Sequence, residues 1–199
     1  MACEPAAATS RRPAAGDAAG PARALRADAR RNREKVIEIA FQAFAAEGLS
    51  VPVHEIARRA GVGTGTVSRH FPTKEALFEA VLLSRVERIM EVGQALARGA
   101  DPGEAFFAFF AELVAEGTAN KGLAEALAGA GFDLDAVAAG SGHNVMGRMR
   151  ELLVRAQQAG AVRADVDIDD VKALVTGCLA RGASARDRMV SVARAGLRG

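Results

Sequence analysis

The chain has 199 residues, half of them hydrophobic, and a formal net charge of +2. This length can bury one large core, or a small domain followed by a larger one. The sequence contains no run of about 18 uncharged apolar residues, and residues 1–30 mix arginines and acids without an apolar stretch, so we expect no membrane span, no signal peptide and a cytoplasmic location.

Positive charge is concentrated towards the N-terminus. Residues 1–75 hold 12 Lys and Arg against 8 Asp and Glu, and the remainder holds 14 against 16. This bias favours contact with nucleic acid by the N-terminal part. The two cysteines, Cys3 and Cys178, lie in a terminal segment and an apolar stretch, which does not indicate a disulfide framework.

Residues 1–27 are rich in Ala, Pro and Gly and show no apolar periodicity, which predicts a flexible tail. The arginines here permit two interpretations: a solvated tail, or an arm that lies along phosphates or enters a minor groove of DNA. The arginines nearest the folded part are the expected backbone contacts, namely Arg30, Arg31 and Arg33. The first predicted helix covers residues 28–47.

Residues 53–71 predict two short helices around a tight turn. Ile56 and Ala60 recur at helical spacing, and Gly61 ends the first helix because glycine permits a left-handed backbone. The second helix starts with Gly63 as its N-cap and ends before the following proline.

The second short helix directs short hydroxyl groups and longer donors outward, which suits insertion into a major groove. These residues are Thr64, Thr66, Ser68, Arg69 and His70. Gly65 lies among them and permits close approach of the backbone to DNA. A further helix starts at Lys74, capped by Thr73, where the ammonium group can sit beside a phosphate.

These residues resemble the N-terminal domain of the TetR/AcrR family of bacterial transcription regulators. The similarity runs from about Arg30 to about Glu87. The matched positions are Ile37, Ala40, Phe44, Gly48, Ile56, Ala57, Ala60, Gly61, Val62, Gly65, Thr66, Val67, His70, Phe71, Lys74, Glu75, Ala76 and Leu77. Residues 132–137 (FDLDAV) and 155–175 also resemble the regulatory domain of an actinobacterial subgroup.

Two positions depart from the family pattern. Ser68 stands where the family usually has a tyrosine that meets a phosphate, and Gly63 stands where a serine usually caps the recognition helix. Ser68 still donates a hydrogen bond, but from a shorter stem, which implies a different register on DNA or a lower affinity.

Apolar periodicity predicts helices over residues 74–98, from 102 onward, and over 121–130, 133–159, 167–183 and 185–197, and no strand pattern is present. The expected fold is therefore all-α, with about nine helices. It divides into a tail (residues 1–27), a three-helix helix-turn-helix domain (28–88, motif about 52–71) and a helical regulatory and dimerisation bundle (89–199). The helix over 74–98 connects the two domains and is expected to transmit motion.

Phenylalanines in residues 106–110, together with methionines and leucines in residues 146–153, permit two interpretations: the ordinary core of a helical bundle, or the wall of a ligand cavity. His143 could orient a ligand, although Gly140 and Gly142 beside it also fit a helix break with an exposed histidine. The expected pocket residues are Phe106, Phe109, Phe110, Leu113, His143, Met146, Met149 and Leu153.

The last two predicted helices each carry an apolar stripe, which indicates a self-complementary interface across a twofold axis. The family resemblance implies the same pairing. The expected interface residues are Val171, Leu174, Val175, Cys178, Met189, Val190, Ala193 and Leu197. For Cys178, packing is favoured over a role as a redox switch.

Two suggestive motifs lack the context that catalysis needs. The glycine-rich segment 61–65 follows a helix and not the strand of a phosphate-binding loop. His54 and Glu55 begin a zinc-site pattern that Arg58 breaks. We therefore expect no enzyme activity, no cofactor and no metal.

The sequence as a whole predicts a homodimeric repressor that a small apolar molecule releases from a palindromic double-stranded DNA operator. The alternative is a helical small-molecule binding protein with a weakened DNA-binding domain, which Ser68 and Gly63 bring into consideration.

Overall fold

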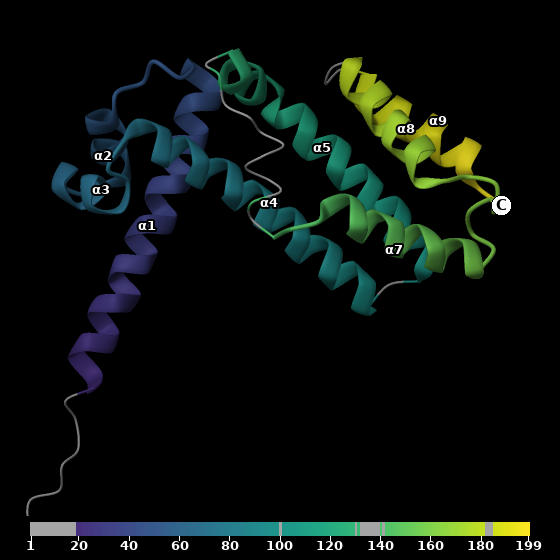
Figure 1. Cartoon of the computed structure of the whole chain (residues 1–199), viewed down its shortest axis with the longest axis horizontal. Coiled ribbons are helices and arrows are strands. Elements are labelled where there is room, and N and C mark those ends of the chain that lie inside the picture. Colours follow the sequence, from purple (N-terminus) through teal and green to yellow (C-terminus); the bar gives the residue numbers. More distant parts are fainter. Residues whose placement is uncertain (1–18, 100, 130, 132–139, 141, 182–184) are drawn as a thin grey trace, which may run out of the picture.

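The computed structural model describes residues 19–99, 101–129, 131, 140, 142–181 and 185–199, and within these ranges the chain is built from helices (Figure 1). The eight helices are α1 (Ala19–Glu47), α2 (Val53–Ala60), α3 (Thr64–His70), α4 (Lys74–Gly99), α5 (Pro102–Gly129), α7 (Val145–Gln158), α8 (Ile168–Ala180) and α9 (Arg186–Leu197). The described residues contain no strand, only an isolated antiparallel bridge between Val162 and Arg198. The all-α prediction is confirmed.

We call α1, α2, α3 and the first ten residues of α4 (74–83) the head, and the other helices with the rest of α4 the body. The head core forms where the apolar faces of its four helices meet, and the Phe44 and Phe78 rings contact edge to face with centroids 4.7 Å apart. Burying a side chain of this size stabilises the fold by about 1.5–3 kcal/mol. Core residues no more than 2% exposed include Val36, Ala40, Phe44, Ile56, Ala60, Val67, Leu77 and Val81.

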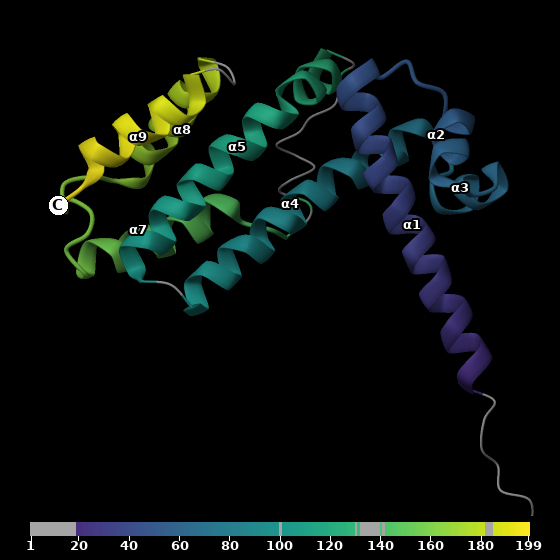
Figure 2. The same ribbon diagram turned by 180° about the vertical axis from the view of Figure 1, so that it is seen from behind.

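The C-terminal end of α5 completes the head core. Leu123 and Leu127 are 2% and 0% exposed and pack with the head residues. Figures 1 and 2 show this end of α5 beside the C-terminal end of α1. Head and body therefore share buried surface, so a movement of α5 acts directly on the head.

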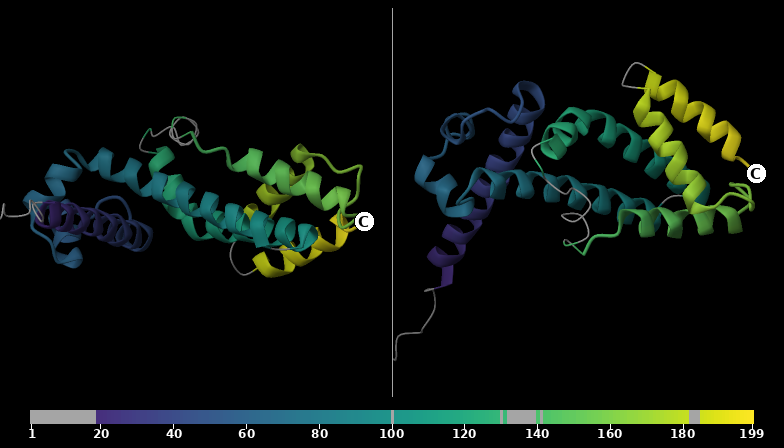
Figure 3. Two further views of the ribbon diagram at one scale, coloured as in Figure 1. Left: turned by 90° about the horizontal axis from the view of Figure 1, so that it is seen from below. Right: turned by 45° about the horizontal axis from the view of Figure 1, so that its top comes forward.

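The body is organised around α5, which packs against α4, α7, α8 and α9. Phe106, Phe109 and Phe110 of α5 are at most 1% exposed and meet Met149 and Leu152 of α7 in one core. Figure 3 shows α8 and α9 together at the end of the molecule farthest from the head.

The predicted flexible tail is wrong for residues 19–27, because α1 begins at Ala19 and not at residue 28. Alanine, leucine and arginine in this segment are strong helix formers. Pro21 falls in the first turn, where a missing N–H removes no helical hydrogen bond. Residues 1–18 lie outside the described residues.

The helix predicted over residues 121–130 is the last part of α5 and not a separate element. Gly122 lowers helix propensity by about 1 kcal/mol, but the buried leucines that follow it hold the helix against the head.

The helix predicted over 133–159 is also shorter, because α7 begins only at Val145. Gly142 has φ +72°, and Asn144 caps α7 by accepting the Gly147 N–H through Oδ1 at 2.6 Å. Residues 132–139 and 141 lie outside the described ranges. The last two helices lie close to their predicted ranges of 167–183 and 185–197. Asp167 forms a capping box at the start of α8, which ends at Ala180, and α9 covers Arg186–Leu197.

Candidate nucleic-acid interface

The turn between α2 and α3 has the geometry that its glycines predict. Gly61 adopts φ +66° and ψ 33°, and its N–H and that of Val62 donate to carbonyls in the last turn of α2. Gly63 then sets an extended N-cap for α3 with φ −68°. Val67 is fully buried beneath the turn. This arrangement fixes α3 on the head and leaves its opposite side open.

The predicted reading residues lie on the open side of α3. Thr64, Ser68 and Arg69 are exposed, whereas Thr66 and His70 are half-buried and less free to reach a ligand. A Cβ added at Gly65 would meet no atom within 4 Å, so the helix backbone itself is accessible there. Hydroxyl donors at the start of an accessible helix, and a guanidinium in its last turn, can reach base edges in a major groove.

Cationic side chains flank this helix. Lys74 starts α4, where Thr73 Oγ1 accepts the Ala76 N–H at 3.1 Å, as the predicted cap requires. The Arg33 guanidinium lies 5.5 Å from the ring centroid of Phe71, the residue that ends α3. Lys74 and Arg33 therefore stand at the same end of α3, where a phosphate backbone would run beside an inserted helix.

The other two predicted backbone contacts are exposed and lie farther out on α1. Arg30 pairs with Glu34 at 3.5 Å, and Arg31 pairs with Asp28. Such exposed pairs contribute about 0–1 kcal/mol. They therefore do not prevent either arginine from binding a phosphate.

An ion-pair network that the sequence analysis did not anticipate fastens α2 to the end of α1. Arg59 Nε donates to Glu55 at 2.7 Å, and its Nη2 donates to Glu47 at 3.0 Å. Hydrogen bonds from Arg58 and Arg59 lower the pKa of Glu55 to about 2. The i, i+3 and i, i+4 spacings within α2 predict half of this network, but its link to Glu47 depends on the tertiary fold.

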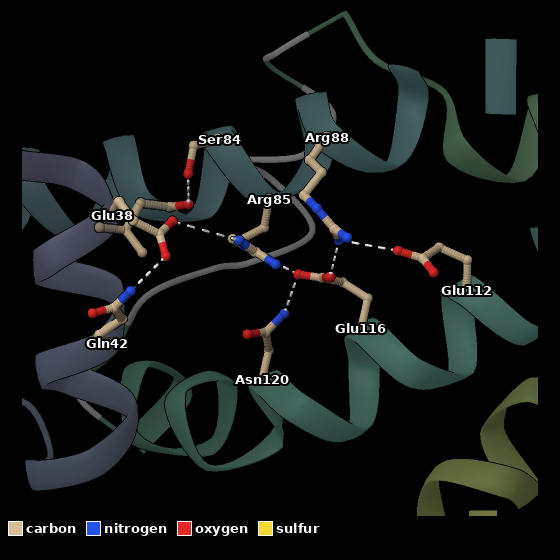
Figure 4. A network of polar contacts seen from close by, with 9 residues as sticks. Glu38, Gln42, Ser84, Arg85, Arg88, Glu112, Glu116 and Asn120 are labelled. Carbon is tan, nitrogen blue, oxygen red and sulfur yellow. Dashed lines mark hydrogen bonds and ion pairs between the residues drawn. The ribbon is translucent and has the colours of Figure 1, made fainter. Parts of the chain in front are cut away.

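A second polar network joins α4 to α5 within the body, and Figure 4 shows its residues. Glu116 of α5 accepts hydrogen bonds from Arg85 Nε at 2.5 Å, Arg88 Nη1 at 2.7 Å and Asn120 Nδ2 at 2.6 Å. We call these four residues the Glu116 joint. Burial raises the pKa of Glu116, but the hydrogen bonds and the positive charges of Arg85 and Arg88 outweigh it and lower the pKa overall.

Arg85 also connects the Glu116 joint to α1. Its guanidinium lies 4.3 Å from the ring centroid of Phe41 and 4.0 Å from Glu38. Three helices, α1, α4 and α5, therefore meet at one arginine. Its contacts with α5 span 31 residues of sequence, which no local pattern reveals.

Seven of the eight predicted ligand-pocket residues, all except His143, come together in the body core but are tightly packed. Leu113 and Met146 are half-buried against the same core, and His143 is half-buried just before the cap of α7. The remaining five are at most 3% exposed: Phe106, Phe109, Phe110, Met149 and Leu153. Their packing agrees with the core interpretation.

An open apolar groove of about 630 Å³ lies elsewhere, between α8 and α9. Five of its lining residues were predicted to form a dimer interface: Leu174, Cys178, Met189, Ala193 and Leu197. Val192 also lines the groove and is 61% exposed.

The predicted interface residues lie at different depths. Val171 and Cys178 are 0% and 1% exposed within the single chain, so they pack inside it, whereas Val175 and Val190 are half-buried. Burial raises the pKa of the Cys178 thiol, which makes it a poor nucleophile.

The described ranges lack two further kinds of feature. They hold no group of three or more His, Cys, Asp or Glu side chains placed to bind a metal ion. None of their helices is both long enough and apolar enough to cross a membrane.

Comparisons with known proteins agree with this arrangement of head and body. Residues 36–81 match the family described as "Bacterial regulatory proteins, tetR family", and residues 101–199 match "Transcriptional regulator SbtR-like, C-terminal domain". The HTH-type transcriptional regulator SrpR of Pseudomonas putida is 42% identical over 65 residues. That match covers 32% of this chain and 30% of SrpR.

Solved structures extend the similarity to most of the chain. The TetR transcription regulatory protein from Mycobacterium vanbaalenii is 49% identical with a TM-score of 0.76, over 88% of this chain and 99% of that one. The TetR transcriptional regulator SCO0520 from Streptomyces coelicolor is 31% identical with a TM-score of 0.71, over 83% and 98%. The chain therefore belongs to the TetR family of bacterial transcriptional regulators, with a DNA-binding N-terminal domain.

Proposed function

We propose that the protein is a ligand-responsive repressor that binds a palindromic operator as a homodimer in the cytoplasm. The observation that carries the proposal is the accessible outer side of α3, where Thr64 in the first turn and Arg69 in the last turn are exposed and the backbone at Gly65 is open. Two such helices about 34 Å apart would enter successive major grooves on one side of the duplex.

The residues divide into two roles on DNA. Thr64, Thr66, Arg69 and His70 read base edges, and of these Thr64 and Arg69 have the freest side chains. Contacts to phosphate supply most of the salt-dependent affinity. They come from Arg30, Arg31, Arg33, Ser68 and Lys74.

The second copy covers the groove between α8 and α9. Burying an exposed apolar groove of this volume is favourable. Val192 at its wall is 61% exposed in the single chain, whereas the aliphatic side chains of the body core are buried. A twofold axis would place the same groove on both partners.

The effector is a small apolar molecule that enters between α5 and α7, against the predicted pocket residues. Because Phe106 and Phe110 fill this region at 0–1% exposure, entry requires α7 to move. That movement reaches α4, since Arg155 Nη1 of α7 donates to the Ala97 carbonyl at 2.7 Å. The shift of α4 would change the spacing of the two heads and weaken operator binding.

Selection of duplexes from a random pool, followed by competition binding, tests this function. The expected result is a palindromic sequence bound at least 1,000-fold more tightly than random duplex, as specific regulators do. The variant Gly65→Ala should keep or raise helix stability by up to about 1 kcal/mol and yet weaken operator binding, because its added methyl group meets DNA and not protein. Equal affinity for selected and random duplex contradicts the proposal and favours a small-molecule binding protein.

A further inference from the structure

A stripe of arginines runs along the N-terminal part of α1, before the residues of that helix that pack in the head core. Its members recur at spacings of three and four residues, and on a helix with 3.6 residues per turn they fall within about 80° of arc. They are Arg23, Arg26, Arg30 and Arg33. Arg23 and Arg30 lie seven residues apart, and the same step leads on to Ile37 and Phe44 in the head core. The stripe therefore continues the face by which α1 packs in the head core.

This part of α1 is far more basic than the chain as a whole. Residues 19–35 hold six Lys and Arg against two Asp and Glu, whereas the whole chain carries only +2. Arg23, Arg26 and Arg30 are exposed. The Arg30–Glu34 pair leaves its side chains 77% and 61% exposed, so solvent screens it strongly and a phosphate can displace it.

The stripe begins at the reading helix and leads away from the body. Arg33 marks its inner end, 5.5 Å from the Phe71 ring at the close of α3. Arg23 lies ten residues farther out, which corresponds to about 15 Å along a helix. Figures 1 and 2 both show this end of α1 projecting clear of the other helices.

We propose that the arginine stripe binds the phosphate backbone of duplex DNA beside the half-site that α3 reads. The inference rests on the proposed function and extends its contact surface to the N-terminal end of α1. Duplex DNA carries one negative charge per about 1.7 Å of axis when both strands are counted, so the length of about 15 Å beside the stripe carries about nine charges, about half of them on each strand. Guanidinium groups match phosphate in geometry and remain charged at every relevant pH.

The test compares two variants that each remove two positive charges. Arg23→Gln/Arg26→Gln alters the stripe outside the residues of the proposed function, and glutamine keeps the helix propensity of arginine. Arg98→Gln/Arg150→Gln is the control, since both residues are exposed on the body far from the head. Binding to the selected operator with long flanks, and to random duplex, is measured by fluorescence anisotropy across a salt series.

For each bound protomer, the stripe variant should flatten the slope of log K against log salt by about 1.8. This change corresponds to an affinity loss of about 60-fold per protomer at 0.1 M salt. Its preference for operator over random duplex should stay unchanged, because phosphate contacts carry no sequence information. On an operator trimmed to the half-sites, wild type and stripe variant should bind equally well.

An unchanged slope for the stripe variant overturns the inference, and so does an equal loss in the control. A difference that persists on the trimmed operator overturns the flanking position. The proposed function fails separately: wild-type protein would then show no preference for any duplex sequence, while the slopes of the two variants on random duplex still report on the stripe.

Discussion

Arg85 and Glu116 should be coupled energetically, and a double-mutant cycle with Arg85→Gln, Glu116→Gln and the double variant measures that coupling. Their side chains are only 19% and 12% exposed, and the Nε–Oε1 distance is 2.5 Å. Exposed ion pairs contribute about 0.2–1 kcal/mol, whereas hydrogen bonds to charged groups contribute about 1.5–3 kcal/mol. For this partly buried pair we expect a coupling free energy of about 1–2 kcal/mol.

The control cycle uses Arg88 and Glu112, which join the same two helices at 3.0 Å but are 47% and 28% exposed. Its coupling should stay below about 1 kcal/mol. Urea unfolding followed by circular dichroism at pH 7 supplies the free energies, and similar m-values across the variants would show that the unfolded states are comparable. The reasoning is refuted if the coupling of Arg85 and Glu116 is under about 0.5 kcal/mol or no larger than that of the control.

Three further perturbations have defined outcomes. Because the pKa of Glu55 is lowered to about 2, its stabilising effect is present above the ordinary value of 4.5 and declines as pH falls towards 2. The variant Glu55→Gln should therefore lose less thermal stability than wild type as the pH falls over that range. An equal loss in the variant and in wild type would contradict this. Gly93→Ala would place a Cβ 2.8 Å from Arg148 and 2.9 Å from Phe109. Urea unfolding should show a loss of about 1–3 kcal/mol, and wild-type stability would disprove such tight packing. Val192→Arg should give a monomer in light scattering at concentrations where wild type is dimeric, and a dimer of normal affinity would rule out this interface.

The head could be predicted from sequence because its features are local. Gly61 requires a positive φ, Gly63 and Thr73 are caps, and Val67 lies on one face of a single short helix. Each of these follows from neighbours within about four residues. The structure reproduces them, and the exposure of Thr64 and Arg69 agrees with the role expected of α3.

The parts that sequence analysis missed depend on distant neighbours or on competing local signals. A separate helix was predicted over residues 121–130, but packing of Leu123 and Leu127 against the head makes this segment the last part of α5. The prediction of a flexible tail rested on the Ala, Pro and Gly content of residues 1–27 and on their lack of apolar periodicity, although alanine also favours helix and α1 begins at Ala19. The Glu116 joint links residues about 30 positions apart, so it has no periodic signature.

The central claim, that the open face of α3 reads base edges while its flanks hold phosphates, is tested most directly by comparing Arg69→Ala with Lys74→Ala on every single-base variant of the selected operator. Arg69→Ala should cost about 1–3 kcal/mol and lose discrimination at one or two base pairs, whereas Lys74→Ala should weaken binding about equally at all of them. If Arg69→Ala also weakens binding uniformly and leaves every base preference intact, α3 does not read the sequence and the account is wrong.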